Sequence, residues 1–493
     1  MHASGFEEGE PQSGPAYYVS VNSGHDNNAG TRSAPWKTIT RAVRSDSGVQ
    51  PGSTIFVEAG TYPEQVVVQK DDIRLIGYKN TPGDQPPILV NQAIDPATLG
   101  SGYPFNANDM PLLDGGNRAS GTGIDLRGRQ KVTVRNFSLH RYAIGANTGS
   151  ASQNFVEGHV PDNVNVSTIG NISASYHGMA MSLGSVSPRK YAHGNVLTNI
   201  LIVNAAAEGL KIFGDDNDID TIRVYGAETG LGATDYYIVV FGSRNHVNLG
   251  YIWRKPHSTL NGGGHWGHAY TIKDNSDQRD GGGRLMAENN VFENVVAEHM
   301  GEGFAVRHRG VRYNTFRNAT ARGQHAINHP GGPYVCHSSG DDHSAIVIRD
   351  GASHNQFIDI EASNTCRVVS ITDTEEDENG VAGVPSNDPW PRSPSQNLIE
   401  NLHSTDTAVA VSFSSSGIAT DAGDNTLRNA VFVDAETLFV AYRPSTGMKY
   451  ENSTFDSLGV NVGLFGYGSH LGDVKRSQFT GCTFTDVKLP VGW

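Results

Sequence analysis

Two cationic residues that end short β-type runs are the strongest chemical signal in the sequence. Lys273 closes the run AYTIK, and Arg307 closes the run FAVR. Each run is followed by an Asn-x-x-Phe or Asn-x-Phe segment, at Asn289–Phe292 and Asn314–Phe316. If successive runs stack on one another, the two cations lie on neighbouring strands, where they could stabilise negative charge on a bound substrate.

Aligning the β runs that precede each Asn turn extends this pair to a column. One position of the alignment is aliphatic in every run, as an inward-facing stack requires: Ile212, Val240, Ile272, Val306, Ile348 and Ile371. Strand side chains alternate, so the next position should point outward. That position reads Phe213, Phe241, Lys273, Arg307, Arg349 and Thr372. Neighbouring strands lie about 4.8 Å apart, so the three cations would form a basic column about 10 Å tall.

Three like charges on paired strands are destabilising unless something compensates them. One interpretation is that nearby acids neutralise them, with Asp274, Glu302 and Asp350 as candidates. The other is an anion-binding groove that meets the carboxylates or sulfates of a polysaccharide. Histidines crowd the same segment, which favours the second interpretation: His265, His268, His299, His308, His325 and His329.

The elements that must position these residues recur along the chain. A β run, a polar turn and an Asn-x-aliphatic or Asn-x-Phe segment repeat at Asn195, Asn217, Asn245, Asn290, Asn314, Asn355, Asn397, Asn425 and Asn452. A period in the twenties, with insertions where it is longer, suits one coil of a parallel β-helix, in which each coil buries its apolar face against its neighbours. Asn at a fixed turn tolerates left-handed geometry and can hydrogen-bond its counterpart on the next coil.

Composition limits the classes of function. The formal charge of −14 over 493 residues argues against general nucleic-acid binding, which needs a broad basic surface. No apolar run reaches the roughly 20 residues of a membrane-spanning helix. Three cysteines are too few for a disulfide framework, and Cys336 and Cys366 could either pair or remain buried thiols. The start of the chain has no apolar signal core, so a secreted or periplasmic, bacterial location is expected from function alone.

The N-terminal region resembles the cap and first turns of right-handed parallel β-helix proteins of the pectate-lyase-like superfamily. The matching residues are Gly30, Pro35, Thr38, Ile39 and Ala42, then Pro51, Gly52, Ile55, Gly60, Thr61, Tyr62 and Glu64. The resemblance implies an all-β, single-stranded, right-handed parallel β-helix with a short helical cap near residues 35–43 and loop insertions, one of them over 80–121. We expect residues 1–15 to be a disordered start and residues 16–493 to form one domain.

The segment around Lys273 and Arg307 is similar to the alginate lyase and chondroitinase B family. A β run that ends in lysine, an Asn-x-x-Phe turn and a run that ends Arg-His-Arg-Gly carry this resemblance. It implies that Lys273 is the base and Arg307 an acid or charge stabiliser. The sequence departs from the family in the insertion DQRDGGGRLMAE, and the acidic calcium ligands expected upstream are absent, with Trp266 and His268 in their place. We therefore expect no cofactor and no metal site.

The chemistry implied is β-elimination from an acidic, uronate-containing and alginate-like polysaccharide or oligosaccharide. A base removes the C5 proton, and a cation stabilises the enolate-like charge that develops on the adjacent carboxylate. A lysine can serve as base if cationic neighbours such as Arg307 lower its pKa. His268 or Tyr270 would be the supporting acid. Flanking sugars would be held by Arg349, Arg309, His308, His265 and His329, and by the aromatic residues Tyr236, Tyr237 and Trp253.

Three other functions stay open at this stage. Asp215 and Asp216, in the segment GDDNDID, are a candidate carboxylate pair for a glycoside hydrolase or glycosyl-transferring enzyme on the same fold. A non-catalytic carbohydrate-binding β-helix is the third class. C5-epimerases share the proton abstraction, although their Asp-Pro-His-Glu motif is absent. We expect neither nucleic acid nor a membrane as partner.

Overall fold

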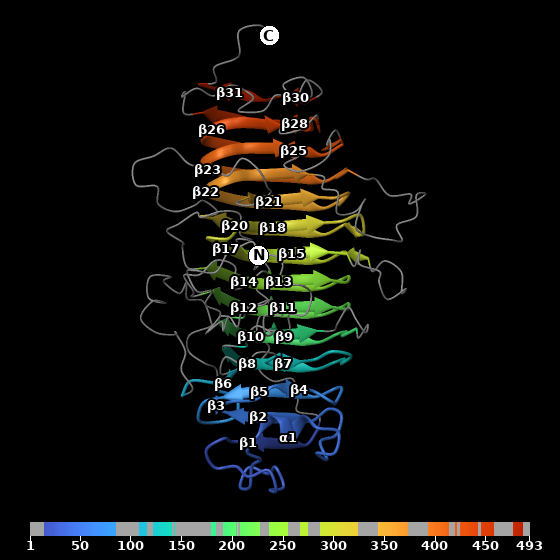
Figure 1. Cartoon of the computed structure of the whole chain (residues 1–493), viewed down its shortest axis with the longest axis vertical. Helices are drawn as coiled ribbons and strands as arrows, with labels where there is room; N and C mark the ends of the chain where they lie inside the picture. The colour runs from blue at the N-terminus through green and yellow to red at the C-terminus, as the bar shows by residue number, and fades with distance from the viewer. Residues whose placement is uncertain are drawn as a thin grey trace, which may run out of the picture.

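The protein is a right-handed, single-stranded parallel β-helix, seen as a tall column of stacked strands (Figure 1). The computed structural model describes residues 14–84, 108–115, 122–140, 142, 179–183, 191–203, 205, 208–226, 236–254, 267–274, 286–323, 344–372, 393–413, 420–421, 424–441, 445–457 and 477–486. Strand pairings in the large sheet are parallel from the first coil to the last. This confirms the predicted fold class.

A short helix and the first coils close the N-terminal end of the column. These elements are β1 (Ala16–Val19), α1 (Ile39–Val43), β2 (Thr54–Glu58), β3 (Gly60–Tyr62), β4 (Val66–Val67), β5 (Arg74–Tyr78), β6 (Pro111–Asp114) and β7 (Ile124–Asp125). The Thr38 side chain caps α1 by accepting from the amide of Arg41, and the Glu64 carboxylate accepts from the amides of Ile39 and Thr40. The predicted helical cap is present. The predicted loop over 80–121 is interrupted by β6.

Each middle coil contains one short strand and one longer, bent strand. The short strands form what we call the front sheet: β9 (Met179–Leu183), β11 (Glu208–Phe213), β13 (Tyr236–Phe241), β15 (His268–Lys273), β18 (Glu302–Arg307) and β21 (Ser344–Arg349). The bent strands are β8 (Thr133–His140), β10 (Val196–Val203), β12 (Asp218–Gly226), β14 (His246–Arg254), β17 (Val291–Glu298) and β20 (Thr315–Arg322). Each bends at a residue with positive φ, such as Asn199 or Asn294.

Towards the C-terminal end the two kinds of strand merge. β22 (Gln356–Thr372), β23 (Leu398–Phe413) and β26 (Val431–Ala441) each run through both sheets. The remaining strands are β25 (Thr426–Arg428), β28 (Lys449–Glu451), β29 (Thr454–Ser457), β30 (Gln478–Thr480) and β31 (Thr483–Thr485), with the small pairs β16 (Ala287–Glu288) and β19 (Val311–Arg312), and β24 (Thr420–Asp421) and β27 (Ser445–Thr446).

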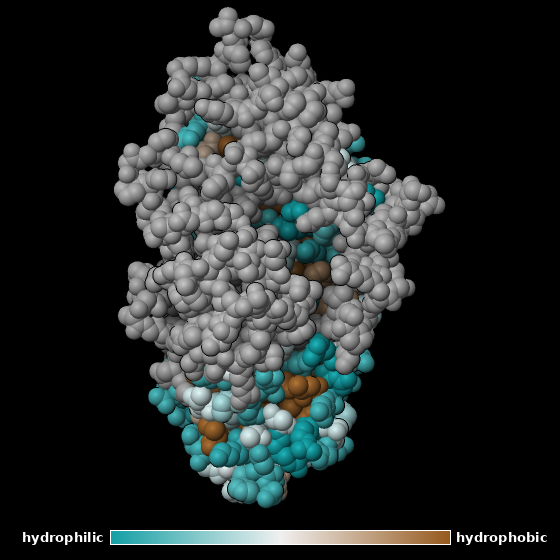
Figure 2. Space-filling view, in the orientation of Figure 1, coloured by the Kyte–Doolittle hydropathy of each residue, from teal (hydrophilic) through white to brown (hydrophobic). Residues whose placement is uncertain are grey.

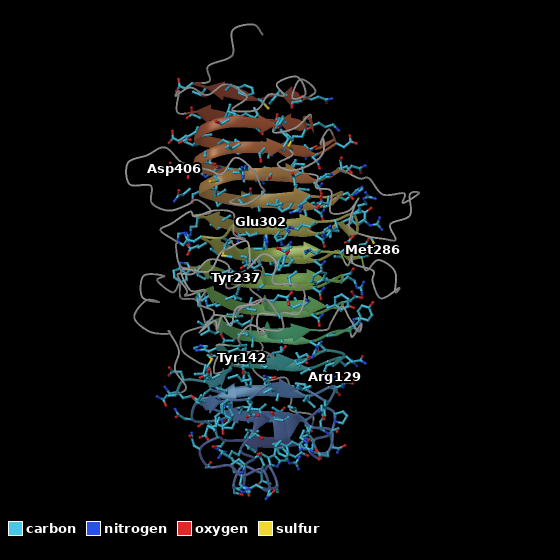
Figure 3. All side chains as sticks on the ribbon, viewed as in Figure 1. Arg129, Tyr142, Tyr237, Met286, Glu302 and Asp406 are labelled. Atoms are coloured by element: carbon cyan, nitrogen blue, oxygen red, sulfur yellow. The ribbon has the colours of Figure 1, made fainter. Side chains whose placement is uncertain are left out.

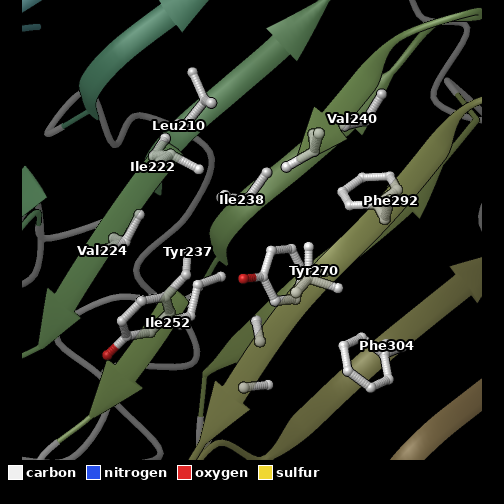
Figure 4. Close-up of a cluster of buried hydrophobic side chains, with 14 of the residues drawn as sticks. Leu210, Ile222, Val224, Tyr237, Ile238, Val240, Ile252, Tyr270, Phe292 and Phe304 are labelled. Carbon is white, nitrogen blue, oxygen red and sulfur yellow. The ribbon is translucent and has the colours of Figure 1, made fainter. Parts of the chain in front are cut away.

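The core confirms the register that the aligned runs predicted. The aliphatic residues pair in the predicted order along the front sheet, Ile212 with Val240, Val240 with Ile272, and onward to Ile371. All six are fully buried. Opposite them, Phe292 and Phe316 on the bent strands and Phe357 on β22 stack with ring centroids 4.8 and 5.2 Å apart. Figure 4 shows part of this core, in which apolar side chains of successive coils meet across the column.

The predicted asparagine ladder is present over eight coils. From Asn195 to Asn425, each side-chain amide donates to the side-chain oxygen of the next asparagine, over 2.8 to 3.0 Å. The prediction that Asn452 is the ninth member of the ladder is wrong. Lys449 pairs with Thr426, which places Met448 rather than Asn452 beside Asn425. Asn452 instead has a positive φ and donates its backbone amide to Thr480.

Other predictions have mixed outcomes. Cys366 is disulfide-bonded, which contradicts a free thiol there, whereas Cys336 lies outside the described residues. Cys482 is a free thiol. Among the helices in the described part of the chain, none has the length and apolar character needed to cross a membrane.

Candidate functional site

The outer face of the front sheet carries polar side chains in its middle coils. In β15, His268, Thr271 and Lys273 lie on this face, while Ala269, Tyr270 and Ile272 belong to the core. Ala269 and Tyr270 are successive residues that both point into the core, which breaks the simple alternation of strand side chains. The pairings of β15 with β13 and with β18 both skip Ala269. In β11, β13, β15, β18 and β21 the first residue therefore lies on the same outer face as the last.

The predicted cation column is confirmed as a register. Lys273 is paired with Arg307, and Arg307 with Arg349, while Thr372 continues the column. We refer to Lys273, Arg307 and Arg349 as the cation column. Figure 3 labels Glu302, the first residue of β18, in the middle of the molecule at this level.

Acidic residues neutralise two members of the cation column. Glu302 accepts from a terminal nitrogen of Arg307, and the side chains are 1% and 6% exposed. The Nε of Arg349 donates to Asp350 over 2.8 Å. Asp274, the third candidate acid, accepts from the amide of Gly310 over 2.6 Å. The neutralising interpretation therefore holds for Arg307 and Arg349.

Burial and neighbouring charge act in opposite directions on Glu302. Burial alone would raise the pKa of its carboxyl, but the charges and hydrogen bonds of Arg307 and His268 hold that pKa well below its ordinary value. The Nδ1 of His268 lies 3.0 Å from a Glu302 oxygen and 3.2 Å from a terminal nitrogen of Arg307. Glu302 is thus a buried carboxylate that fixes both neighbours, and it is a poor proton donor.

Lys273 differs from the two arginines. It has no carboxylate partner among the residues that the structure describes, and it is half-buried. Its Nζ donates to the hydroxyl oxygen of Tyr236 over 3.1 Å and lies 5.0 Å from the centroid of that ring. The Tyr236 ring stacks on His268 at 4.7 Å. A chain of contacts therefore runs from Glu302 through His268 and Tyr236 to Lys273.

The same face becomes apolar toward the N-terminal coils. Phe213 and Phe241 occupy the positions before Lys273 in the column, and Tyr191 stacks on Phe213 at 5.2 Å. On the face seen in Figure 2, hydrophilic side chains are visible over the middle coils, with an apolar patch beside them. Lys211, also on this face, donates to Glu208 over 2.9 Å.

Three predicted site residues lie elsewhere. Tyr270 is in the core, where its hydroxyl donates to the carbonyl of Val296 over 3.1 Å and burial raises its pKa well above 10.0. Tyr237 is also a core residue (Figure 4). Trp253 is buried on the outside of β14, in a separate cluster with Tyr225 and Tyr251. The exposed-aromatic prediction is wrong for Tyr237, because the break in alternation turns Tyr236 outward and Tyr237 inward. It is also wrong for Trp253, which is buried by its contacts in that cluster.

Two of the other predicted substrate-binding residues lie in the described part of the chain, and two lie outside it. His308 and Arg309 lie in the turn after β18 and are buried, and their predicted role in holding flanking sugars stays a prediction. His265 and His329 lie outside the described residues. Thr271, which the sequence did not single out, is buried between the columns of the outer face, and its hydroxyl has no hydrogen-bond partner in the described part of the chain.

The alternative carboxylate pair is held by an arginine in a turn. Arg244 binds Asp216 through two nitrogens, at 2.7 and 2.9 Å, and reaches Asp215 at 3.4 Å. The hydrogen bond from Arg244 holds the pKa of Asp216 below its ordinary value. A general acid in hydrolysis needs a raised pKa, so Asp216 is not suited to that role.

No group of three or more His, Cys, Asp or Glu residues suited to a metal ion occurs within the described ranges. The expectation that the site binds no metal stays a prediction.

Comparison with known proteins gives a fold but no activity. A family model described as a protein of unknown function (DUF1565) matches residues 22–221. No curated protein sequence matches the chain. A mannuronic acid specific polysaccharide family 6 lyase from human gut microbiota has a TM-score of 0.50 and 10% identity, covering 95% of this chain and 83% of that one.

Two glycoside hydrolases are similarly distant. The catalytic domain of a GH87 alpha-1,3-glucanase has a TM-score of 0.50 and 11% identity, covering 90% of this chain and 67% of that one. A GH136 lacto-N-biosidase from Eubacterium ramulus has a TM-score of 0.47 and 12% identity, covering 96% and 68%. At these identities the likeness is one of fold.

Proposed function

We propose that the protein is a polysaccharide lyase that cleaves an acidic, uronate-containing polysaccharide by β-elimination, with Lys273 as the base. The observation that carries this proposal is the contrast within the cation column. Two of its members are matched by buried carboxylates, whereas Lys273 is half-buried and contacts a tyrosine hydroxyl. An amine held in this way can take a proton from a substrate that lies on the outer face.

The roles of the neighbouring residues follow from their contacts. Arg307, one strand from Lys273, is assigned to the negative charge that develops on the substrate carboxylate. Arg349, one strand further, is assigned to an adjacent acidic sugar. Glu302 keeps Arg307 and His268 in place.

The fold itself is compatible with elimination and with hydrolysis. Its distant structural neighbours include a mannuronic acid specific lyase and an alpha-1,3-glucanase. Glu302 is held as a carboxylate, and Asp216 is bound by Arg244, so neither is suited to protonate a leaving group as a hydrolase acid must. Elimination is therefore the reaction that we propose, in a secreted or periplasmic protein that meets its polymer outside the cytoplasm.

The test is an assay against alginate, chondroitin, pectate and neutral glycans. We expect the absorbance of an unsaturated uronate with an acidic polymer and its loss, by about 10³-fold or more, in Lys273→Ala. Lys211→Ala is the matched control, because Lys211 is on the same face but is paired with Glu208. Reducing ends without that absorbance would indicate a hydrolase, and binding without turnover would indicate a carbohydrate-binding module. Both results contradict the proposal.

The proposal includes a reaction without a metal cofactor. Incubation with a chelator should leave the rate unchanged, and a loss of activity restored by calcium would contradict that part of the proposal while leaving the role of Lys273 open to its own test.

A further inference from the structure

Elimination needs a second proton transfer, for which the sequence offered His268 or Tyr270 as the donor. After the C5 proton is removed, the bond from C4 to the glycosidic oxygen breaks, and that oxygen needs a proton. Tyr270, one predicted donor, is enclosed in the core and bonded to Val296. His268, the other, is 3% exposed and lies against Glu302 and Arg307.

Tyr236 has the position that these two residues lack. It is the first residue of β13, in register with His268, and lies on the outer face of the front sheet. Its side chain is half-buried, so part of it faces outward. Its ring rests on the His268 ring at 4.7 Å with an interplanar angle of 24°. Because His268 is itself fixed by Glu302 and Arg307, this stack fixes the direction of the Tyr236 hydroxyl.

We propose that Tyr236 is the catalytic proton donor to the leaving oxygen and that its contact with Lys273 returns the proton to the start of the cycle. The proposal rests on the lyase function proposed above. It assigns a catalytic role to a residue that the sequence offered only as a platform for sugar stacking.

The proton and electron balance closes within this pair. The neutral Lys273 amine takes the C5 proton, and the electron pair of that C–H bond becomes the double bond between C4 and C5. The C4–O bond breaks with its electron pair on oxygen, and this oxygen takes the Tyr236 proton. The Lys273 ammonium then returns a proton to the tyrosinate oxygen over the 3.1 Å contact seen in the structure. No external acid or base is consumed.

The short separation of the two groups also restricts the substrate. Groups only 3.1 Å apart reach a sugar ring from one side, so the C5 proton and the C4 oxygen must lie on the same face of that ring. Hexuronates of the D-manno and D-gluco configurations meet this condition. Guluronate, galacturonate and iduronate carry the two groups on opposite faces. The substrate class that follows is a polymer of mannuronate or glucuronate type.

The test compares Tyr236→Phe with Lys273→Ala on two leaving groups. On the polysaccharide that the wild type cleaves, Tyr236→Phe should lower kcat by about 10²- to 10⁴-fold with little change in KM. On the same uronate with a nitrophenoxide at C4, which leaves without a proton, Tyr236→Phe should retain nearly full rate. Lys273→Ala should lose both reactions. Tyr225→Phe, which removes a hydroxyl from the outside of β12, is the control and should retain both.

The outcomes separate this inference from the proposed function. If the wild type releases no unsaturated product from either kind of substrate, the lyase function itself is wrong. If the wild type eliminates but Tyr236→Phe keeps full rate on the polysaccharide, or loses both leaving groups equally while folded by thermal melting, Tyr236 is not the donor. A wild type that prefers polyguluronate or polygalacturonate to polymannuronate overturns the same-face assignment.

Discussion

Charged residues run along the axis of the column in two places, and the two sets are built differently. On the bent strands, Asp218, His246, Glu293 and Arg317 form what we call the surface ladder. His246 lies 2.9 Å from Asp218 through Nδ1 and 2.8 Å from Glu293 through Nε2, and Arg317 binds Glu293. Signs alternate from coil to coil, so each residue is the partner of the next.

The cation column on the front sheet has the opposite arrangement. Its members share one sign, so the charges repel along the axis. Glu302 neutralises Arg307, and Asp350 neutralises Arg349. Lys273 receives no such acid in the described part of the chain. A set that neutralises itself needs no ligand to be stable, whereas in the cation column an anion would complete the matching of charges at Lys273. The contrast between ladder and column therefore supports the substrate site that we propose beside Lys273.

The largest effect that separates the two sets should come from Glu302→Gln. It removes the buried carboxylate that accepts from Arg307, so we expect the free energy of unfolding to fall by about 3–5 kcal/mol. Glu293→Gln makes the same change in the surface ladder and should cost about 1 kcal/mol or less, because the Arg317 side chain that it leaves is 54% exposed and solvated. Urea unfolding of both variants measures the difference, and equal losses would contradict the comparison.

A second variant tests whether the loss comes from the pairing of Glu302 with Arg307. In Glu302→Gln with Arg307→Met, both charges are removed together, so about half or more of the stability lost in the single variant should return. Losses that simply add would show that Glu302 and Arg307 are not energetically coupled. The same urea curves supply this measurement.

The pH dependence of stability should reveal the contribution of the Glu302 carboxylate. The pKa of Glu302 in the folded protein is well below its unfolded value near 4.5, so its contribution is present above that value and is lost as pH falls through the folded pKa. We expect the difference in unfolding free energy between wild type and Glu302→Gln to shrink as the pH falls below about 4.5. A difference that stays constant down to about pH 3 would show that the carboxylate charge is not what stabilises the site.

Much of this fold could be predicted because its signals are local and repeated. The aliphatic column from Ile212 to Ile371 and the asparagine ladder each place one residue type at one position of every coil, so an alignment on the turn is enough to find them. The same reasoning failed at Asn452. The Asn-x-x-Phe pattern persists there, but Met448 occupies the ladder position of that coil.

The site could be predicted only in part, because it depends on a departure from the regular pattern. Strict alternation puts Tyr237 outside and His268 inside, and the break at the second residue of each front strand reverses both. Tyr270 has the same parity as Ile272, a signal that could have placed it in the core. The contact of Lys273 with Tyr236 depends on side-chain directions across coils, which no spacing in the sequence encodes.

The smallest effect belongs to His246 and limits how much the surface ladder can contribute. The hydrogen bond to Asp218 raises the pKa of His246 above 6.5, with Glu293 adding to it and burial opposing it. Its stabilising effect is thus fully present below about pH 6.5 and is lost as pH rises through the folded pKa. Because its side chain is 39% exposed, we expect about 0.5 kcal/mol or less, reduced further by salt. Unfolding of wild type and His246→Gln near pH 6 and pH 9 measures it. A larger value that resists salt would mean that the ladder is as strong as the buried pair of Glu302 and Arg307, and the contrast between the two sets would then no longer point to a ligand.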